Sequence, residues 1–304
     1  MWHYGHPSDA LADAKRLDRS MSFKAAAAGL SLGGAKAVIA LSHGERPVGV
    51  RREHLLRDFA DLIESLQGRY ITGQDVGVSL EDISYLAALT EHVAGHPASE
   101  GGSGDPSPYT ARGVEAGIRA SLEGSLCGRH VVVVGLGHVG GDLARRLHKA
   151  GAKLTLSDTD ERKRALASEI GASWVTPDEA LTVSADVLVP CALGGIFDHD
   201  TVALLQVPVI AGAANAQLKD DGIADALAAR GILWAPDFII NAGGLIAVAC
   251  ELDGFDRERA LRAVDGIADT LTEVYAHART DGVSTLAAAK ALAAERLPSS
   301  SLAA

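Results

Sequence analysis

Two lysines, Lys24 and Lys36, lie in a segment (residues 21–41) that is otherwise almost entirely small or apolar. Lys24 opens an alanine run, and Lys36 follows a glycine turn at 33–35. Burying an ammonium among apolar residues is costly unless it is paired, and burial lowers its pKa. A lysine titrating near neutrality can serve as a base or as an electrophile. The alternative for either residue is an ordinary surface lysine whose stem covers apolar side chains.

A glycine-rich loop with the spacing G-x-G-x-x-G forms the second candidate site. It consists of Gly135, Leu136, Gly137, His138, Val139 and Gly140. A β-branched run at 130–134 precedes it, a helical pattern follows it, and Asp158 ends the next predicted strand, 23 positions after Gly135. This complete context predicts a dinucleotide site with the phosphates at a helix N-terminus.

Each position of this loop has an expected role. Gly135 permits a tight turn, Gly137 lets the pyrophosphate approach the backbone, and Gly140 lets the helix pack on the strand. Asp158 would accept hydrogen bonds from the ribose hydroxyls and repel a 2′-phosphate, which favours NAD over NADP. The alternative is that Asp158 only caps the following segment.

Three further turns of small residues come after predicted strands. They are Pro190-Cys191-Ala192-Leu193-Gly194-Gly195, Gly212-Ala213-Ala214-Asn215 and Asn241-Ala242-Gly243-Gly244. The carboxyl edge of an open parallel sheet is where ligands bind, so together these turns suggest close approach by a flat cofactor. Any single one could be an ordinary tight turn.

The hydrophobic pattern predicts an α/β protein with a doubly wound parallel sheet. Strands are expected at 36–42, 69–72, 130–134, 153–157, 173–175, 186–190, 207–211, 232–234 and 238–240. Helices are expected at 8–22, 52–67, from 79, and at 109–122, 244–253, 256–281 and 285–296, with Lys24 just past the first of them. The Gly/Ser/Pro-rich stretch 97–108 is a candidate hinge.

Composition narrows the function classes. At 304 residues the chain can form two domains, and its net charge of −11 argues against nucleic acid as a partner. The sequence has no apolar run long enough for a membrane span and no signal-peptide core. Its three cysteines and eleven histidines lack metal-ligand spacing, so we expect no metal site and a cytoplasmic protein.

Over essentially the whole chain, the sequence motifs and their order resemble those of the glutamate, leucine, phenylalanine and valine dehydrogenase superfamily. The resemblance is close to the leucine, valine and phenylalanine branch. The motifs are Lys24, the Leu-Gly-Gly-Ala-Lys turn ending at Lys36, Gly73-Gln74-Asp75-Val76-Gly77 and Asn241-Ala242-Gly243-Gly244. The resemblance places Lys24 on the substrate carboxylate, makes Lys36 catalytic and makes Asp75 its proton-transfer partner.

The resemblance also assigns the cofactor and amine contacts. It places Thr110 against the nicotinamide amide, Asn241 in the nicotinamide pocket, and Asn215 on the substrate amine near the nicotinamide. Ala192 and Leu193 would contact the cofactor from their turn. The family usually has a second Asn where this chain has Ala216, a departure that could loosen these contacts.

Gly73, Leu245 and Val248 would line the side-chain pocket. Gly73 is Ala in most leucine and valine members and often Gly in phenylalanine members, and Leu245 varies between Val and Leu. No cation stands near these positions to bind a side-chain carboxylate, so we expect a phenylalanine-like or other large apolar L-amino acid rather than glutamate. Discrimination by a methyl group or two is only about 1–3 kcal/mol.

The expected organisation is a substrate domain at 1–118, completed by helices at 282–304, and an NAD-binding Rossmann domain with linking helices at 119–281. Family members begin with strands and a glycine turn upstream of the point that aligns with Met1, so we expect a first domain that lacks them. The usual homo-oligomer is expected as well.

The predicted activity is NAD-dependent oxidative deamination of an apolar L-amino acid to its 2-oxo acid and ammonia. One alternative is an NAD-binding paralogue impaired by the missing strands, although intact Lys36 and Asp75 argue against it. Another is a hydroxyacid dehydrogenase, which usually needs a catalytic histidine; His138 lies within the phosphate loop and does not match.

Overall fold

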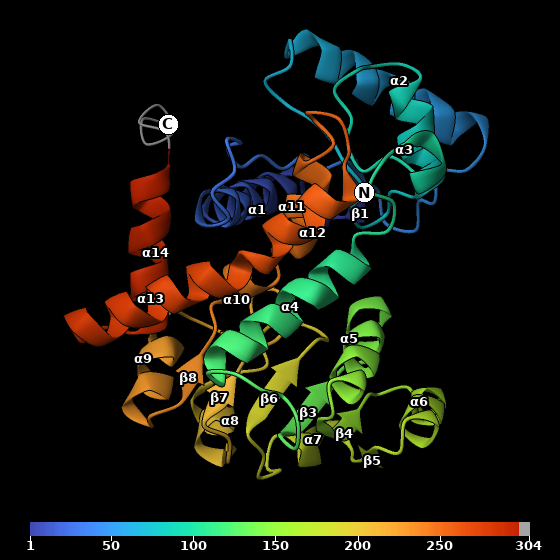
Figure 1. Cartoon of the computed structure of the whole chain (residues 1–304). Coiled ribbons are helices and arrows are strands. Elements are labelled where there is room, and N and C mark those ends of the chain that lie inside the picture. The colour runs from blue at the N-terminus through green and yellow to red at the C-terminus, as the bar shows by residue number, and fades with distance from the viewer. Residues whose placement is uncertain (298–304) are drawn as a thin grey trace.

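The computed structural model describes residues 1–297 and contains two parallel sheets in that range (Figure 1). The larger has the order β5(Ser173–Trp174), β4(Lys153–Ser157), β3(His130–Val134), β6(Val187–Pro190), β7(Val209–Ile210), β8(Leu233–Trp234). The chain runs outward from β3 to β5 and then crosses to β6, which makes the gap between β3 and β6 a topological switch point. The predicted doubly wound sheet is thereby confirmed.

Strand β3 shows why this sheet is buried on both faces. Its valines alternate: Val131 and Val133 pack into one hydrophobic cluster, and Val132 and Val134 pack into another. The first cluster contains residues of α4(Ser107–Ser121), α5(His138–Lys149) and α13(Ile267–Asp281), and the second contains residues of α7(Pro177–Ala180), α8(His199–Leu204) and α9(Gly222–Ala229). A continuous β-branched run is the pattern expected of such a strand.

The smaller sheet belongs to the N-terminal part of the chain. It pairs β1(Trp2–His3) with β2(Ala40–Leu41). Beside it, α2(Val50–Ser65) and α3(Leu80–Ala87) share a small apolar cluster that includes Leu56 and Ile83. In Figure 1 these elements lie above the large sheet, and the long helix α1(Pro7–Ala27) lies between the two regions.

The remaining elements complete the layers. They are η1(Ala98–Glu100), η2(Glu161–Lys163), α6(Arg164–Glu169), α10(Asp237–Ile240), α11(Gly243–Ala249), α12(Arg257–Asp265) and α14(Thr285–Arg296). Helix α14 packs against α1, and its Arg296 donates to the carbonyl of Ala27 at the end of that helix. Within residues 1–297 no helix is both long and apolar enough to cross a membrane. The predicted C-terminal region beyond 297 lies outside the described residues.

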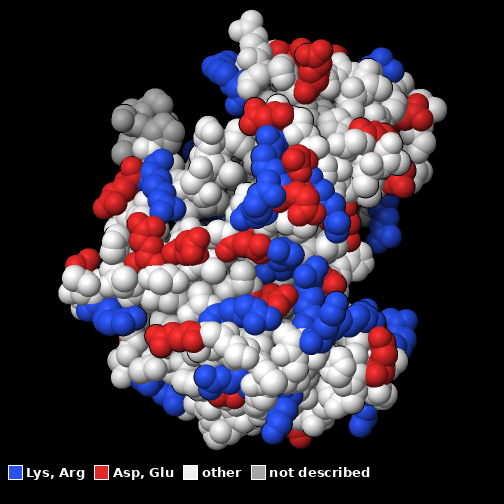
Figure 2. Space-filling model, in the orientation of Figure 1, with Lys and Arg blue, Asp and Glu red and all other residues white. Residues whose placement is uncertain are grey.

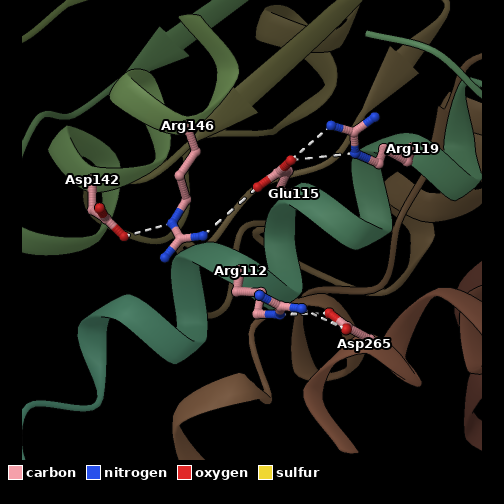
Figure 3. Close-up of polar contacts among 6 residues, drawn as sticks. All are labelled: Arg112, Glu115, Arg119, Asp142, Arg146 and Asp265. Atoms are coloured by element: carbon pink, nitrogen blue, oxygen red, sulfur yellow. Dashed lines mark hydrogen bonds and ion pairs between the residues drawn. The ribbon is translucent and has the colours of Figure 1, made fainter. Parts of the chain in front are cut away.

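Helix α4 connects the two regions and is held by ion pairs (Figure 3). Arg112 makes a bidentate pair with Asp265 at the end of α12, at 2.6 and 2.7 Å. One turn on, Glu115 pairs with Arg119 and lies near Arg146 of α5. On the face shown in Figure 2, cations and carboxylates are interspersed over these helices, so that face has no broad basic surface for a nucleic acid.

Several predicted boundaries are wrong for identifiable reasons. Helix α1 continues through the alanine run to Ala27, so Lys24 lies inside its last turn, and Gly29 (φ 67°) ends it. The predicted strand 36–42 is reduced to Ala40–Leu41, with Ala37 exposed. Residues 69–72 contribute only a single bridge, from Thr72 to Val93.

Two C-terminal predictions are also wrong. The expected strand 238–240 is helix α10, because a short apolar run fits a buried strand and a buried helix equally well. The Asn241 turn therefore follows a helix. The expected helix 256–281 is divided at Gly266 into α12 and α13.

The loop at 95–103 is tied to the end of α11 by Glu251. Its carboxylate accepts hydrogen bonds from the backbone N–H groups of Gly95 (2.8 Å), His96 (3.1 Å) and Ser103 (2.6 Å). Hydrogen bonds to a charged acceptor contribute more than neutral ones, and the buried donors would be left without partners if the carboxylate were removed. Glu251 therefore fixes the segment that leads from the N-terminal region into α4.

Replacing Glu251 by alanine is expected to lower the free energy of unfolding by about 2–4 kcal/mol, because these donors lose their acceptor. Denaturant titration measures this change. Glu258→Ala removes an exposed carboxylate from α12 and serves as the control. An E251A midpoint equal to that of the control would show that the three contacts contribute nothing.

Candidate active site

A polar cluster joins α1 to the loops at the carboxyl edge of the large sheet. The Nζ of Lys24 donates to Oδ1 of Asn215 at 3.2 Å, and Nδ2 of Asn241 donates to the same oxygen at 2.8 Å. Asn241 also donates to the carbonyl of Ala213 at 3.0 Å. The structure therefore brings together three residues of which the first and last, Lys24 and Asn241, lie more than 200 positions apart in the sequence.

The position of Lys24 is set by the packing at the end of α1. Three alanines after it are buried, and Phe23 packs on Phe238 of α10 with ring centroids 6.2 Å apart. Arg296 of α14 donates to the carbonyl of Ala27 at 2.7 Å, which satisfies a free carbonyl at the helix end. Burial lowers the pKa of Lys24 to about 8; the charge of Asp237 opposes this shift and the charge of Lys36 adds to it.

Lys36 and Asp75 form an ion pair on two neighbouring loops. Gly34 explains how the Lys36 loop reaches this position, because a Cβ there would stand 1.9 Å from the backbone nitrogen of Ser22 in α1. Burial lowers the pKa of Lys36. Because the Lys36 charge acts on Lys24, both lysines belong to one electrostatic site.

The glycine loop has the geometry of a dinucleotide site. Gly135 has φ 97°, and a Cβ on Gly140 would stand 1.9 Å from the carbonyl oxygen of Gly135. A Cβ on Gly137 would meet nothing within 4 Å, and no side chain caps α5, which begins with the exposed His138 and the half-buried Val139. The first N–H groups of that helix therefore face open space that suits a phosphate.

The carboxylate of Asp158 lies against this loop. It accepts from the backbone N–H of Leu136 at 2.6 Å and from that of Asp160 at 2.9 Å, so it also has the capping function that was the alternative. Arg162 pairs with Asp160 at 2.8 Å. The negative charge of Asp158 therefore dominates the end of β4, where a ribose would lie.

The small-residue turns pack mainly against one another. A Cβ on Gly135 would stand 2.7 Å from Ala192, and one on Gly194 would stand 2.4 Å from the carbonyl oxygen of Asn215. A Cβ on Gly244 would stand 2.9 Å from Oγ1 of Thr110. Gly135, Gly194 and Gly244 are thus explained by close contact between protein segments. Of the residues in these turns, Gly137, which faces open space, and Leu193, which is 86% exposed, are left accessible to a ligand.

One buried oxygen at this edge has no partner in residues 1–297. Oδ1 of Asn241 accepts no hydrogen bond, although Nδ2 of the same amide makes two. Leaving a buried acceptor unpaired is costly, so it points to a ligand that donates. A carboxamide has the required N–H group, and these residues therefore fit a nicotinamide dinucleotide.

The predicted side-chain pocket residues are placed as follows. Leu245 and Val248 lie on α11 and are partly buried. A Cβ on Gly73 would stand 3.3 Å from the carbonyl oxygen of Ala94, so the glycine also serves the close pairing around Thr72.

Ala216 has φ 49°, a left-handed conformation that suits glycine or asparagine better than alanine. Its carbonyl accepts from the N–H of Gly195 at 2.7 Å, which holds the turn in this form. We expect Ala216→Gly and Ala216→Asn to raise the free energy of unfolding by about 0.5–1 kcal/mol, measured by thermal denaturation. Ala216→Val should lower it, and equal melting temperatures for all of them would contradict this explanation.

The structure adds residues that sequence reasoning missed. Asp237 lies at the start of α10 and interacts electrostatically with Lys24. Behind the Asn215 turn, Gln217 is fully buried and hydrogen-bonds to Trp234. The Pro-Asp pair before the Asn241 turn was the one available signal, since it is typical of a helix start.

Comparisons with known proteins identify the family of this chain. Residues 154–303 match the model "Glutamate/Leucine/Phenylalanine/Valine dehydrogenase", and residues 3–92 match "Glu/Leu/Phe/Val dehydrogenase, dimerisation domain". Leucine dehydrogenase from Thermoactinomyces intermedius is 43% identical over 98% of this chain and 82% of its own length. Valine dehydrogenase from Streptomyces virginiae is 41% identical over 97% of this chain and 84% of its own length.

A solved structure gives the same result. The crystal structure of L-tryptophan dehydrogenase from Nostoc punctiforme superimposes with a TM-score of 0.84 at 39% identity, covering 97% of this chain and 85% of that one. Sequence similarity, fold and motif order therefore agree with the resemblance seen in the sequence. The chain belongs to the glutamate, leucine, phenylalanine and valine dehydrogenase family of amino-acid dehydrogenases.

Proposed function

We propose that this protein catalyses the NAD-dependent oxidative deamination of an apolar L-amino acid to its 2-oxo acid and ammonia. The observation that carries this proposal is the Lys24–Asn215–Asn241 cluster, next to the Lys36–Asp75 pair, at the carboxyl edge of a dinucleotide-binding sheet. A bound dinucleotide would accept the hydride from the substrate Cα. The remaining chemistry is supplied by side chains of this chain.

Substrate binding would exchange the contacts of Lys24. The α-carboxylate of the substrate would form an ion pair with the ammonium of Lys24, and the substrate amine would replace Lys24 as the donor to Oδ1 of Asn215. This exchange pairs the substrate carboxylate with the charge of Lys24 and leaves Asn215 with a donor. It also fixes Cα through its two polar substituents, which positions the substrate for transfer.

Lys36 and Asp75 would move the protons. Asp75 would first take a proton from the substrate ammonium, because hydride leaves Cα only from the neutral amine. Loss of hydride gives an iminium, and neutral Lys36 accepts a proton from the water that adds to it. The protonated Lys36 then polarises the carbinolamine oxygen, while Asp75 returns its proton to the departing amine and takes the hydroxyl proton, which passes to solvent. The lowered pKa of Lys36 is what makes the neutral amine available, so the rate of deamination should rise with pH through that pKa.

Family members use NAD or NADP, and we propose NAD for this chain. Gly135, Gly137 and Gly140 with the N-terminus of α5 would hold the pyrophosphate, and Asp158 would hold the ribose. Thr110 and Asn241 would contact the nicotinamide, beside Ala192 and Leu193. The negative charge of Asp158 disfavours a 2′-phosphate.

For the substrate we propose a large apolar L-amino acid, phenylalanine-like first and then leucine or valine. Gly73 lacks the methyl group that most leucine and valine members carry there, which supports this choice, and so do the leucine, valine and tryptophan dehydrogenases among the relatives. We further propose a homo-oligomer, in which residues 1–118 and the C-terminal helix form the substrate domain and residues 119–281 the cofactor domain.

The test is NADH formation by purified protein with NAD or NADP and single L-amino acids (Phe, Trp, Leu, Val, Glu). Highest activity with NAD and an aromatic substrate would support the full proposal, and highest activity with leucine or valine would overturn only the aromatic preference. NAD binding without NADH formation for any substrate would favour the alternative of an impaired NAD-binding paralogue.

A further inference from the structure

Asp237 is a partly buried carboxylate that the proposed chemistry does not use. Its Oδ2 accepts from the backbone N–H of Gln217 at 3.0 Å, and its Oδ1 accepts from that of Phe238 at 2.7 Å. It lines a cavity of about 380 Å³ between α1, α10 and α14 that also contains Ala216. The carboxylate therefore lies directly behind the turn that presents Asn215.

The Gln217 contact extends this support to the whole turn. The side-chain amide of Gln217 donates to the carbonyls of Gly212 (2.9 Å) and Ala214 (3.0 Å) and accepts from Nε1 of Trp234 (3.0 Å). Gln217 is fully buried and all of these bonds are satisfied, so the network is rigid. Asp237 holds the backbone N–H of Gln217, two residues after Asn215, and so fixes the main chain of this turn.

Asp237 lies near Lys24, because their chain neighbours Phe238 and Phe23 pack with ring centroids 6.2 Å apart. The charged groups that act on Lys24 are Asp237 and Lys36, and the charged group that acts on Asp237 is Lys24. Other charged side chains around the cavity have their own contacts. Lys290 pairs with Asp221, Lys219 with Asp198 and Arg16 with Asp13; Arg19 lies over the ring of Phe23, and Asp220 caps Gly222.

We propose that Asp237 is a positioning residue for the substrate carboxylate: it fixes the Asn215 turn through Gln217 and supplies the negative charge that balances Lys24. The proposal rests on the proposed function of the same site. Its consequence is that Asp237, without touching substrate, sets the pH range in which Lys24 binds a carboxylate.

Asp237→Asn tests this role because it removes the charge and keeps the shape of the side chain. Its amide nitrogen cannot accept a hydrogen bond, so one of the two backbone N–H groups loses its acceptor, and a control for that structural loss is needed. We expect the alkaline rise in the KM for the amino acid to begin about 1 pH unit lower than in the wild type, since an opposite charge near a lysine holds its pKa up. The Kd for NAD should stay the same. In a Lys24→Arg background, where the cation cannot lose its proton, D237N should no longer move the pH profile.

Trp234→Phe is the matched control for a purely structural role. It breaks the same network at the Trp234–Gln217 bond without changing any charge, so it should lower the melting temperature and leave the KM profile in place. An unchanged profile in D237N, in a wild type that is active, would overturn the proposal. An inactive wild type would instead contradict the proposed function itself.

Discussion

Replacing Lys36 by alanine lowers kcat for deamination by about 10²–10⁴-fold, the range that a positioned acid or base contributes. Within residues 1–297 the Asp75 carboxylate contacts the Lys36 ammonium and the backbone N–H of Val76, and of these only the Lys36 amine can accept a proton from water in the proposed mechanism. The KM should change much less, since the proposed mechanism assigns Lys36 to the reacting water and Lys24 to the substrate carboxylate. Steady-state NADH formation with saturating NAD measures both quantities.

Two companion variants separate proton transfer from charge. Lys36→Arg retains the cation but cannot become neutral, so it should be nearly as inactive as the alanine variant. Lys153→Met changes an exposed lysine at the first residue of β4, at the end of the strand away from Asp158, and should leave kcat unaltered. An active Lys36→Arg enzyme would show that the site needs only a positive charge at this position.

The sheet of the cofactor region could be predicted because its signals are local. The valine run of β3, the glycine spacing and Asp158 lie within one βαβ unit, where register and turn are dictated by neighbouring residues. The structure reproduces that unit, with β3 and β4 paired in parallel at the centre of the predicted pattern.

The N-terminal region was harder to predict because tertiary contacts determine it. The stretch after Gly33 has the composition of a buried strand, yet it runs as a loop because Gly34 packs against α1 and β1 pairs with only two residues of β2. The Lys24–Asn215 contact spans 191 positions, and no local pattern reports it. Asp237 was missed for the same reason, since its role arises only where α1 meets α10.

Replacing Lys24 by methionine is expected to have the second large effect, which is a loss of substrate binding. The substrate carboxylate loses its cation in a partly buried site, which typically costs about 2–5 kcal/mol, so kcat/KM should fall by a factor between about 30 and about 5,000. In the wild type, Lys24 carries its charge below its pKa of about 8. The KM for the amino acid should therefore rise about tenfold per pH unit above that value, and the variant should lose this dependence.

The same substitution should raise stability, because the folded state holds the Lys24 proton less tightly than the unfolded chain does. The pKa of Lys24 falls from 10.5 to about 8 on folding. Wild-type stability therefore rises between these two pH values and is lowest, with respect to this group, below about 8. Lys24→Met removes that penalty, so its melting temperature at neutral pH should exceed that of the wild type, whereas Lys15→Met, at an exposed position of α1, should not. If the Lys24→Met variant binds substrate poorly and is also less stable than the wild type, Lys24 is chiefly a structural link from α1 to Asn215. If the variant is more stable but binds substrate poorly, the fold tolerates a costly charge because the substrate requires it.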